Sequence, residues 1–334
     1  MKRPVSVAVA VLVLIVGSCG SDPDTAATVL SETLVAPTEA PTPDPTPAPT
    51  TTITTTTEVP PTSAATPPED DAENEPEPEA TLFETFDSDN FTLAPSVIDN
   101  EWLPLTPGMR LVYKGTTNEE DELLSHTVIL TVTDLVKEID GVLTLVAWDQ
   151  DFADGELVET ELAFYAQDDD GTVWRMGEYP EEYEDGELVE APAWLAGLAD
   201  AKAGMAMLAD PQLGSRSYSQ GWGPDVDFID RALIEEVGAD VCISLDCYAN
   251  VLVIAEFNVE EPNSFQLKYF APGVGNIRVD WRGDDTTQEE LDLVEIVQLT
   301  AEELAAAHDA AFDLEAQAYE TSAVYQATPP ARQR

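Results

Sequence analysis

The chain has very little positive charge. Only 14 of its 334 residues are Lys or Arg, against 66 Asp or Glu, which gives a formal net charge of −52 at pH 7. Proteins that bind nucleic acid or anionic lipid headgroups neutralise phosphates with Lys and Arg. The composition therefore excludes nucleic acid as a partner. Residues 86–299 alone hold 46 acidic and 10 basic side chains, an acidity also typical of proteins from salt-adapted organisms.

Histidine, cysteine and the common catalytic motifs are also scarce. The chain has two histidines, His126 and His308, and three cysteines, and it contains no GxSxG, HExxH, P-loop or GxGxxG motif. We therefore predict no cofactor and no enzymatic activity. A hydrolase that uses two carboxylates is the alternative, because such acids can lie anywhere in a sequence. Among so many acids, the sequence nominates no pair.

The only long apolar run is too short to span a membrane. It covers residues 5–16, follows Lys2 and Arg3, and ends in Val-Gly-Ser-Cys at Cys19, which is typical of a secretory signal. The pattern resembles the bacterial lipobox. That resemblance implies that residues 1–18 are removed and that Cys19 is lipidated, so that the protein stays on the extracytoplasmic side of the cell membrane. The alternative is an ordinary signal peptide that leaves Cys19 as a free thiol.

Residues 19–85 are rich in Thr, Pro and Glu and have few large apolar side chains. Such a segment buries too little apolar surface to offset the entropy of ordering. We predict a disordered stalk, which its Thr-Pro content suggests is O-glycosylated.

Residues 86–299 alternate short apolar and polar runs with turn signals such as "IDG", "ADG" and "DDDG". This pattern predicts a mainly β domain, in which an antiparallel curved sheet of about ten strands forms a partly open barrel or a sandwich. The strands are expected at 110–115, 126–137, 143–150, 157–167, 172–177, 228–237, 248–259, 265–271, 277–282 and 291–299. A short helix is expected at 192–201.

A C-terminal helix is predicted for residues 300–321, because Thr300 and Glu303 form a capping box. Its apolar stripe, which includes His308, Phe312 and Tyr319, either docks on the β domain or meets a partner. Residues 322–334 are expected to be disordered.

Cys242 and Cys247 flank a four-residue turn in an exported chain. This spacing predicts a disulfide across a hairpin.

Three successive acids, Asp168, Asp169 and Asp170, precede Gly171 and form the strongest local signal for Ca²⁺. The pattern stops after the glycine and lacks the alternating ligands and closing Glu of a calcium loop. We therefore favour a plain hairpin turn and predict no metal site. Trp194 and Trp222 lie in irregular segments, so their exposure is of interest.

Three phrases span most of the β domain: "IDNEWLPLTPGMRLVYKG", "FYAQDDDGTVWRMGE" and "YFAPGVGNIRVD". They resemble a group of secreted or lipid-anchored β-rich bacterial proteins that has no known activity. Curved sheets of this size are also similar to half-barrel carriers of lipids. We therefore predict a surface-anchored, non-enzymatic domain that binds an apolar or envelope ligand, or a protein, in the concavity of its sheet. A continuous cavity lined by Trp and Leu without inward-facing acids would favour this binding domain, whereas two carboxyl groups that face each other across a cleft would favour the hydrolase.

Overall fold

The structure is a computed structural model, and it describes residues 83–92, 97–119, 122–261 and 263–334. The predicted signal peptide, Cys19 and nearly all of the predicted stalk lie outside these residues. Within the described ranges, no helix has the length and apolar character needed to cross a membrane.

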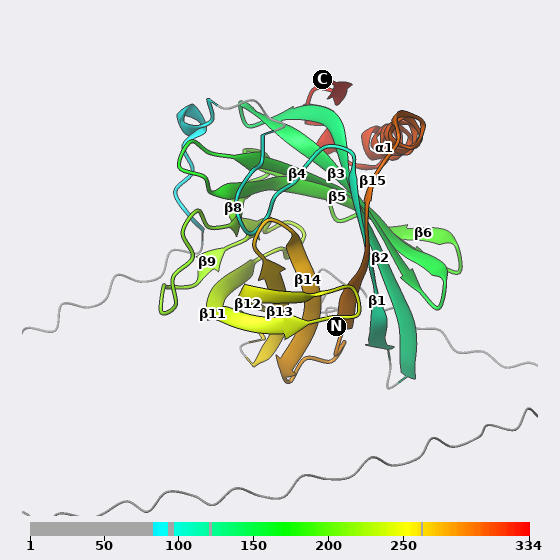
Figure 1. Cartoon of the computed structure of the whole chain (residues 1–334). Coiled ribbons are helices and arrows are strands. Elements are labelled where there is room, and N and C mark those ends of the chain that lie inside the picture. Colours follow the sequence, from blue (N-terminus) through cyan, green and yellow to red (C-terminus); the bar gives the residue numbers. More distant parts are fainter. Residues whose placement is uncertain (1–82, 93–96, 120–121, 262) are drawn as a thin grey trace, which may run out of the picture. The chain divides into compact units, whose positions relative to one another are not determined.

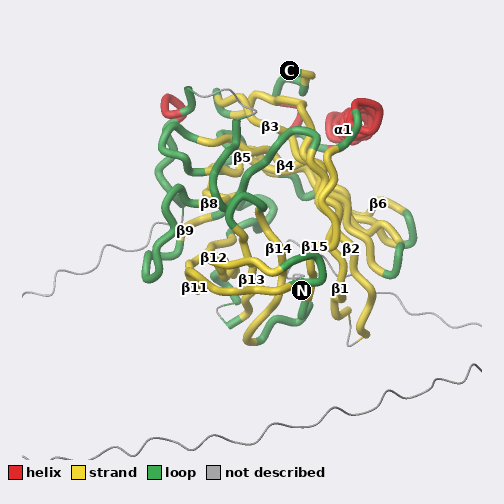
Figure 2. The backbone as a smooth tube through the Cα atoms, in the orientation of Figure 1, coloured by secondary structure: helices red, strands yellow, loops and turns green. Residues whose placement is uncertain are grey.

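The strands form one antiparallel sheet that curls into a nearly closed barrel (Figure 1, Figure 2). This confirms the predicted fold class. Two meanders make up most of it. The first runs through β1 (Met109–Glu119), β2 (Glu122–Ile139), β3 (Val142–Ala153), β4 (Glu156–Gln167) and β5 (Val173–Glu184). The second runs through β11 (Asp230–Cys242), β12 (Cys247–Asn258), β13 (Ser264–Ala271), β14 (Gly275–Gly283) and β15 (Glu290–Gln298), and β15 pairs with β1.

The two free edges of the sheet approach each other at residues 218–222. β9 (Tyr218–Ser219) pairs with β11, and β10 (Gly221–Trp222) pairs with β8 (Lys202–Met207), which itself pairs with β5. Between them, the Gln220 amide donates a hydrogen bond to the Asp230 carbonyl at 2.9 Å. One short stretch of chain thus bridges the last gap in the barrel. Gly204 is required here, because a Cβ would collide with the backbone of residues 220 and 221.

Two-residue turns account for the register of the β2–β3 and β3–β4 hairpins and of the hairpin that β5 forms with β6 (Glu187–Glu190). Asp140-Gly141, Asp154-Gly155 and Asp185-Gly186 all have positive φ at both positions, as type I′ hairpin turns require. The third of these turns adds β6, an exposed strand that the sequence analysis did not predict.

Residues 97–108, which we call the strap, connect the two meanders at one end of the barrel. The Asn100 amide donates to the carbonyls of Gly171 and Leu208, and the Gly273 amide donates to the Glu101 carbonyl at 2.7 Å. Apolar strap residues pack in one buried cluster with strand residues of both meanders, namely Ile98, Leu105, Val132, Leu252 and Phe270. This end of the barrel is therefore filled.

The C-terminal helix α1 (Ala301–Thr321) forms as predicted, with a complete capping box between Thr300 and Glu303. It docks on the outer face of β2 and β4. Ala307, His308, Ala311, Leu314, Glu315 and Ala318 are its buried residues, and His308 pairs with Asp134 of β2 at 2.6 Å. The helical stripe thus covers the barrel of its own chain, as one of the two interpretations expected.

The prediction of a disordered tail at 322–334 is wrong. The tail forms the 3-10 helix η2 (Tyr325–Ala327) and the short strand β16 (Arg332–Gln333), which pairs with β2. Tyr325 is fully buried, with edge-to-face ring contacts to Tyr179 at 5.5 Å and Tyr319 at 5.1 Å. One aromatic anchor orders a segment whose composition alone predicts no structure.

The helix expected at 192–201 is also wrong. Trp194–Leu195 form β7, which pairs with β5, and Gly197, Ala199 and Asp200 all have positive φ. Trp194 is buried and stacks on Phe228 with ring centroids 4.9 Å apart, and Trp222 is half-buried. Pairing with β5 outweighs the helical propensity of the alanines.

Candidate functional site

The barrel encloses a cavity of about 230 Å³. Strands of both meanders contribute to its wall, together with Leu103 of the strap and Gln220 of residues 218–222, the closing segment that bridges the gap in the barrel. Its lining contains six acidic and two basic side chains: Asp149, Asp151, Glu161, Asp230, Glu256 and Glu289, with Arg175 and Lys268. The aromatic residues of the lining are Tyr113, Tyr165, Phe228 and Phe270.

An acidic wall forms where β3 and β4 lie side by side. Asp149 pairs directly with Glu161, and Asp151 pairs with Glu159, so the four side chains share the inner face of the sheet. The next strand adds Glu182 opposite Glu159. Carboxyl groups at alternate positions of neighbouring strands are thereby gathered inside the barrel.

Burial of this wall favours the uncharged form of its carboxyls. Burial raises the pKa of Glu161 to about 8, and the neighbouring Glu178 adds to the rise. Burial also raises the pKa of Asp149 to about 7. One oxygen of each carboxyl, Oε1 of Glu161 and Oδ1 of Asp149, is buried without a hydrogen-bond partner. Such buried acceptors are unusual in folded proteins and call for an explanation.

The two basic residues of the cavity are already paired. The Arg175 guanidinium contacts Glu178 at 3.0 Å and donates to the Tyr165 hydroxyl at 3.1 Å. The Lys268 ammonium contacts Glu256 at 2.7 Å. Burial by itself would lower the pKa of both basic groups, but Tyr165 and Glu178 outweigh it at Arg175, and Glu256 does so at Lys268. Both residues therefore stay charged.

Asp230 lies on the β11 side of the cavity. Burial raises its pKa to about 7, and the nearby Glu256 charge adds to this effect. It accepts a long hydrogen bond of 3.3 Å from Asn258. The Gln220 side chain donates to Glu256 at 2.6 Å, which ties the closing segment to the cavity wall.

His126 joins two of the lining acids beside the cavity. One ring nitrogen contacts Asp151 and the other lies 3.0 Å from Glu289. Burial would lower the His126 pKa, but hydrogen bonds to Asp151 and Glu289 outweigh it and raise the pKa to about 10. His126 is thus a charged clamp at neutral pH and is unsuited to act as a general base.

These inward-facing acids differ from the lining that the sequence interpretation set for an apolar ligand. A cavity for an apolar ligand was expected to be lined by Trp and Leu without acids. Instead, acids line much of the wall and no tryptophan is among the lining residues found in the described part of the chain. The sequence assigns Asp149 and Asp151 to the surroundings of a hairpin turn and nominates no carboxyl pair, although "WDQD" and "ETE" place acids two residues apart in or next to predicted strands. In a chain with 66 acids, that spacing alone does not separate an inner face from an outer one.

Asp168, Asp169 and Asp170 lie apart from this cavity, in the turn between β4 and β5. Asp168 is buried and accepts hydrogen bonds from the Thr172 amide at 2.9 Å and the Trp174 indole at 2.8 Å. Asp169 accepts from the Thr92 hydroxyl, and Asp170 accepts from the amide of Asn90, which ends the 3-10 helix η1 (Ser88–Asn90). Protein donors therefore occupy all three carboxylates. No group of acids, His or Cys with metal-holding geometry is found within the described ranges.

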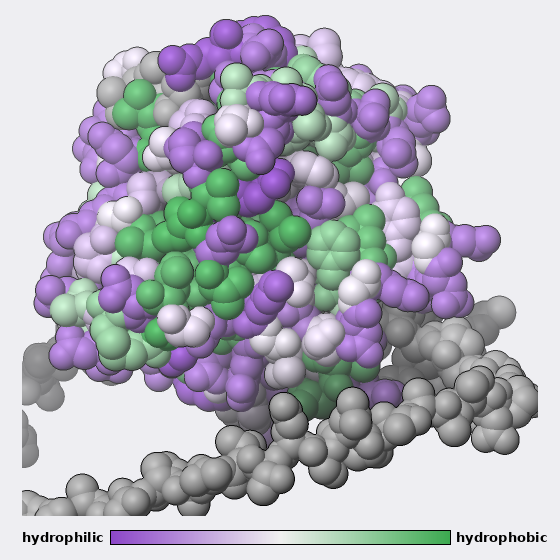
Figure 3. Space-filling model, turned by 45° about the vertical axis from the view of Figure 1, so that its right-hand side comes forward, coloured by the Kyte–Doolittle hydropathy of each residue, from purple (hydrophilic) through white to green (hydrophobic). Residues whose placement is uncertain are grey.

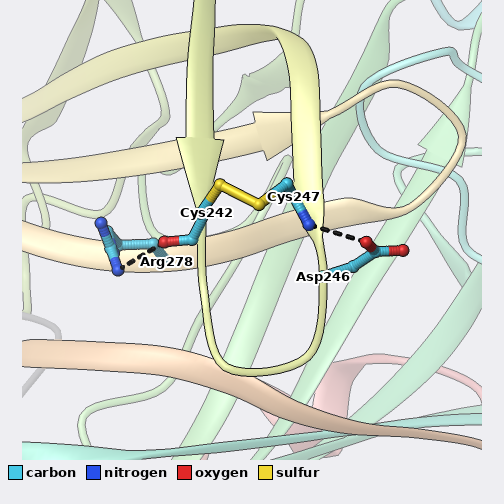
Figure 4. Close-up of a disulfide and its surroundings, with 4 residues drawn as sticks. All are labelled: Cys242, Asp246, Cys247 and Arg278. Carbon is cyan, nitrogen blue, oxygen red and sulfur yellow. Dashed lines mark hydrogen bonds between the residues drawn. A yellow bond between two sulfur atoms is a disulfide. The ribbon is translucent and has the colours of Figure 1, made fainter. Parts of the chain in front are cut away.

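Cys242 and Cys247 form a disulfide at the end of the β11–β12 hairpin (Figure 4). The two residues also pair in the register of the two strands. The Cys242 carbonyl accepts a hydrogen bond from Arg278 of β14, and the Cys247 amide donates to Asp246 at 2.8 Å. The disulfide thus fixes an exposed turn, and neither cysteine lines the cavity.

No protein-family model and no curated protein matches the chain. Two solved structures are similar to it. A Bacteroides fragilis protein described as exported, with a YmcC-like fold, aligns with a TM-score of 0.36 and 10% identity over 59% of this chain and 99% of its own. A Parabacteroides distasonis protein described as a lipoprotein aligns with a TM-score of 0.29 and 14% identity over 60% of this chain and 100% of its own. The similarity is one of structure, and no sequence family is shown.

Proposed function

We propose that this protein is a non-enzymatic binding domain that holds a small polar ligand inside its barrel. One observation carries the proposal: the Glu161 carboxyl lines the cavity, is 8% exposed, and leaves one oxygen without a partner. Leaving a buried acceptor unsatisfied costs about 1–3 kcal/mol. A ligand that donates a hydrogen bond to Glu161 would remove this cost.

The size and lining of the cavity support a small molecule over a protein partner. Ligand sites usually combine apolar and aromatic surface with a few convergent polar groups. Here Tyr165, Phe228 and Phe270 supply the aromatic surface, and the wall of β3 and β4 supplies the polar groups.

The alternative, a hydrolase with paired carboxylates, gains less support. Such enzymes place one protonated and one ionised carboxyl on either side of the bond that is cleaved. Asp149 and Glu161 instead lie side by side on neighbouring strands, and burial raises the pKa of both. Two carboxyls with the same shift and the same orientation do not divide the roles of acid and nucleophile.

The proposed place of action is the extracytoplasmic side of the cell membrane, with Cys19 as the lipid anchor and residues 19–85 as the stalk. The lipobox-like sequence supports it.

A thermal-shift screen tests the binding function. The full chain is heated with small polar compounds grouped as neutral sugars, amines and carboxylic acids. We expect one class to raise Tm by several degrees, because ligands that bind only the folded state stabilise it. Ala206→Phe fills the cavity and should abolish the shift, whereas Ala209→Phe, at an exposed position nearby, should keep it. If no class shifts Tm, or if both variants respond like the parent protein, the proposal is wrong.

A further inference from the structure

We infer that the ligand carries an ammonium group with N–H donors, and that Asp149 and Glu161 bind it inside the barrel. The inference rests on the proposed binding function and specifies the chemical class of the ligand.

Arg175 is paired with Glu178 and Lys268 with Glu256, and both pairs have contacts of 3.0 Å or shorter. Neither Asp149 nor Glu161 takes part in a salt bridge among the residues that the structure describes. The cavity therefore has more carboxyls than cations, and these two are adjacent carboxyls that lack a salt bridge.

Oδ1 of Asp149 and Oε1 of Glu161 are buried acceptors without donors, and the two residues are direct neighbours across β3 and β4. An ammonium group offers up to three N–H donors and a positive charge. Bonds between a charged donor and a carboxylate are roughly twice as strong as neutral ones. A hydroxyl or an amide would satisfy one oxygen, but as a neutral donor it would not favour the ionised carboxylates.

Tyr165, Phe228 and Phe270 line the same cavity. Aromatic faces attract cations, most strongly where water is excluded. The lining thus suits both the charged and the apolar parts of a small organic amine.

Without ligand, burial keeps a substantial fraction of Asp149 and Glu161 protonated at pH 7, because it raises their pKa values to about 7 and about 8. An ammonium favours the ionised carboxylates. Binding at pH 7 should therefore release protons from the wall, and a neutral ligand should release none.

The probes are two amines and their uncharged counterparts of similar shape: 1,4-diaminobutane with 1,4-butanediol, and glucosamine with glucose. Calorimetric titrations use the full chain in 1 M NaCl. At that salt concentration the Debye length is ~3 Å, so attraction to the acidic surface is suppressed while buried pairs are screened much less. We expect at least one amine to bind at least tenfold more tightly than its counterpart. Repeating the titration in two buffers of different ionisation enthalpy measures the released protons.

Asp149→Asn combined with Glu161→Gln removes the two carboxyls and keeps their shapes. We expect this variant to lose at least tenfold in amine affinity and to release no protons. Glu138→Gln combined with Glu156→Gln changes the net charge equally at exposed positions of β2 and β4 and should bind like the parent protein. Circular dichroism establishes that both variants are folded, and proton release by the parent protein provides a test that needs no variant.

The outcomes separate this inference from the proposed function. If neither amine binds more tightly than its uncharged counterpart, and Ala206→Phe abolishes the binding of glucose or 1,4-butanediol, the ammonium inference is wrong and the binding function stands. If an amine binds without proton release, or equally well to the Asp149→Asn and Glu161→Gln variant, the inference is also wrong. If no probe binds, the ammonium inference fails, and the wider thermal-shift screen decides the binding function separately.

Discussion

At the scale of single residues, the interior of this barrel is governed by the cost of burying carboxyl groups. Asp149, Glu161 and Asp230 all have a pKa of about 7 or 8, and in each the main cause is burial. Asp151 and Glu289 are instead held by His126. The cavity thus combines acids that have a cationic partner with acids that have none, and only the latter are expected to respond to a ligand.

The raised pKa values predict how stability depends on pH without ligand. An unfolded chain protonates Asp and Glu near pH 4, whereas folded Asp149 and Glu161 stay protonated up to pH 7 or 8. The folded state therefore binds more protons between these values, and stability is lost as pH rises through the folded pKa values. We expect the free energy of unfolding, measured by urea denaturation, to fall from pH 5 to pH 9 by more than about 1.4 kcal/mol, the equivalent of one pKa unit.

The Asp149→Asn and Glu161→Gln variant isolates this contribution from the repulsion between surface acids. The free energy of unfolding of this variant should fall less from pH 5 to pH 9 than that of the parent protein. Glu138→Gln combined with Glu156→Gln should not reduce the fall in this way. An equal decline in the parent protein and the interior variant would contradict the burial of these carboxyls.

The sequence predicts where the hairpin turns lie better than it predicts on which face of the sheet a side chain lies. Asp140-Gly141 and Asp154-Gly155 are recognisable because only a few residue types tolerate positive φ. The inward direction of Asp149 and Glu161 is not recognisable in the same way. Acids at alternate positions of a strand usually mark the solvent face, and here the closed sheet turns that face inward.

At the scale of elements, the C-terminal tail is part of the folded core. Lys137 of β2 is fully buried, and its ammonium contacts Glu315 of α1 at 3.0 Å, the Pro329 carbonyl at 2.8 Å, and the ring face of Tyr325 with its centroid at 4.0 Å. The strand, the helix and the tail therefore meet at one buried cation.

We predict that Tyr325→Ala destabilises the protein by about 3–5 kcal/mol, the usual cost of removing a fully buried aromatic side chain. The loss should also weaken the Lys137 contacts, because Tyr325 covers that ammonium. Urea denaturation measures the effect. Gln326→Ala, at the adjacent exposed position, should change stability by less than about 0.5 kcal/mol. A small effect of Tyr325→Ala would show that the tail does not contribute to the core.

The β11–β12 hairpin offers a second prediction at this scale. Its disulfide closes a loop with a sequence separation of 5, and so short a loop stabilises by roughly 2 kcal/mol in the chain-entropy model. Replacing both Cys242 and Cys247 with Ser should lower the free energy of unfolding by about that amount and leave the barrel folded. Peptide mapping without reduction should find the two cysteines linked, and two free thiols would contradict the bond.

The long elements are predictable from sequence, and the short ones are not. α1 and the ten long strands have strong periodicity, clear turns or a capping box. β7, β9, β10 and β16 are two residues long and exist only because a neighbouring strand offers an edge. Three of the four depend on pairing with β5, β8 or β11 within a closing sheet, which is tertiary information that local sequence does not contain.

At the scale of the whole molecule, the first prediction concerns attachment to the membrane. Cys19 follows a short apolar run and a small-residue segment typical of lipoprotein signals. Two acyl chains give stable anchoring, whereas one gives only marginal binding. We expect Cys19→Ser to release the protein from the membrane fraction into the medium and mass spectrometry to find a diacyl group on the parent N-terminus. A Cys19→Ser protein that stays membrane-bound, together with an unmodified parent N-terminus, would refute the anchor.

The second prediction at this scale concerns charge. Hydrophilic side chains cover much of the visible face, with an apolar area near its centre (Figure 3), and the full chain carries −52. Repulsion between like charges destabilises a compact state. The Debye length falls from ~30 Å at 0.01 M salt to ~3 Å at 1 M. We therefore expect Tm to rise steadily with NaCl.

Calcium distinguishes this general screening from a specific site. Protein donors already occupy Asp169 and Asp170, since the two carboxylates accept from Thr92 and Asn90. A Ca²⁺ ion would have to displace these donors, so micromolar to millimolar Ca²⁺ at constant ionic strength should raise Tm only slightly and without saturation. Asp169→Asn with Asp170→Asn should leave that small response unchanged. A saturable rise of many degrees that this double variant abolishes would mean that the turn between β4 and β5 binds Ca²⁺ after all.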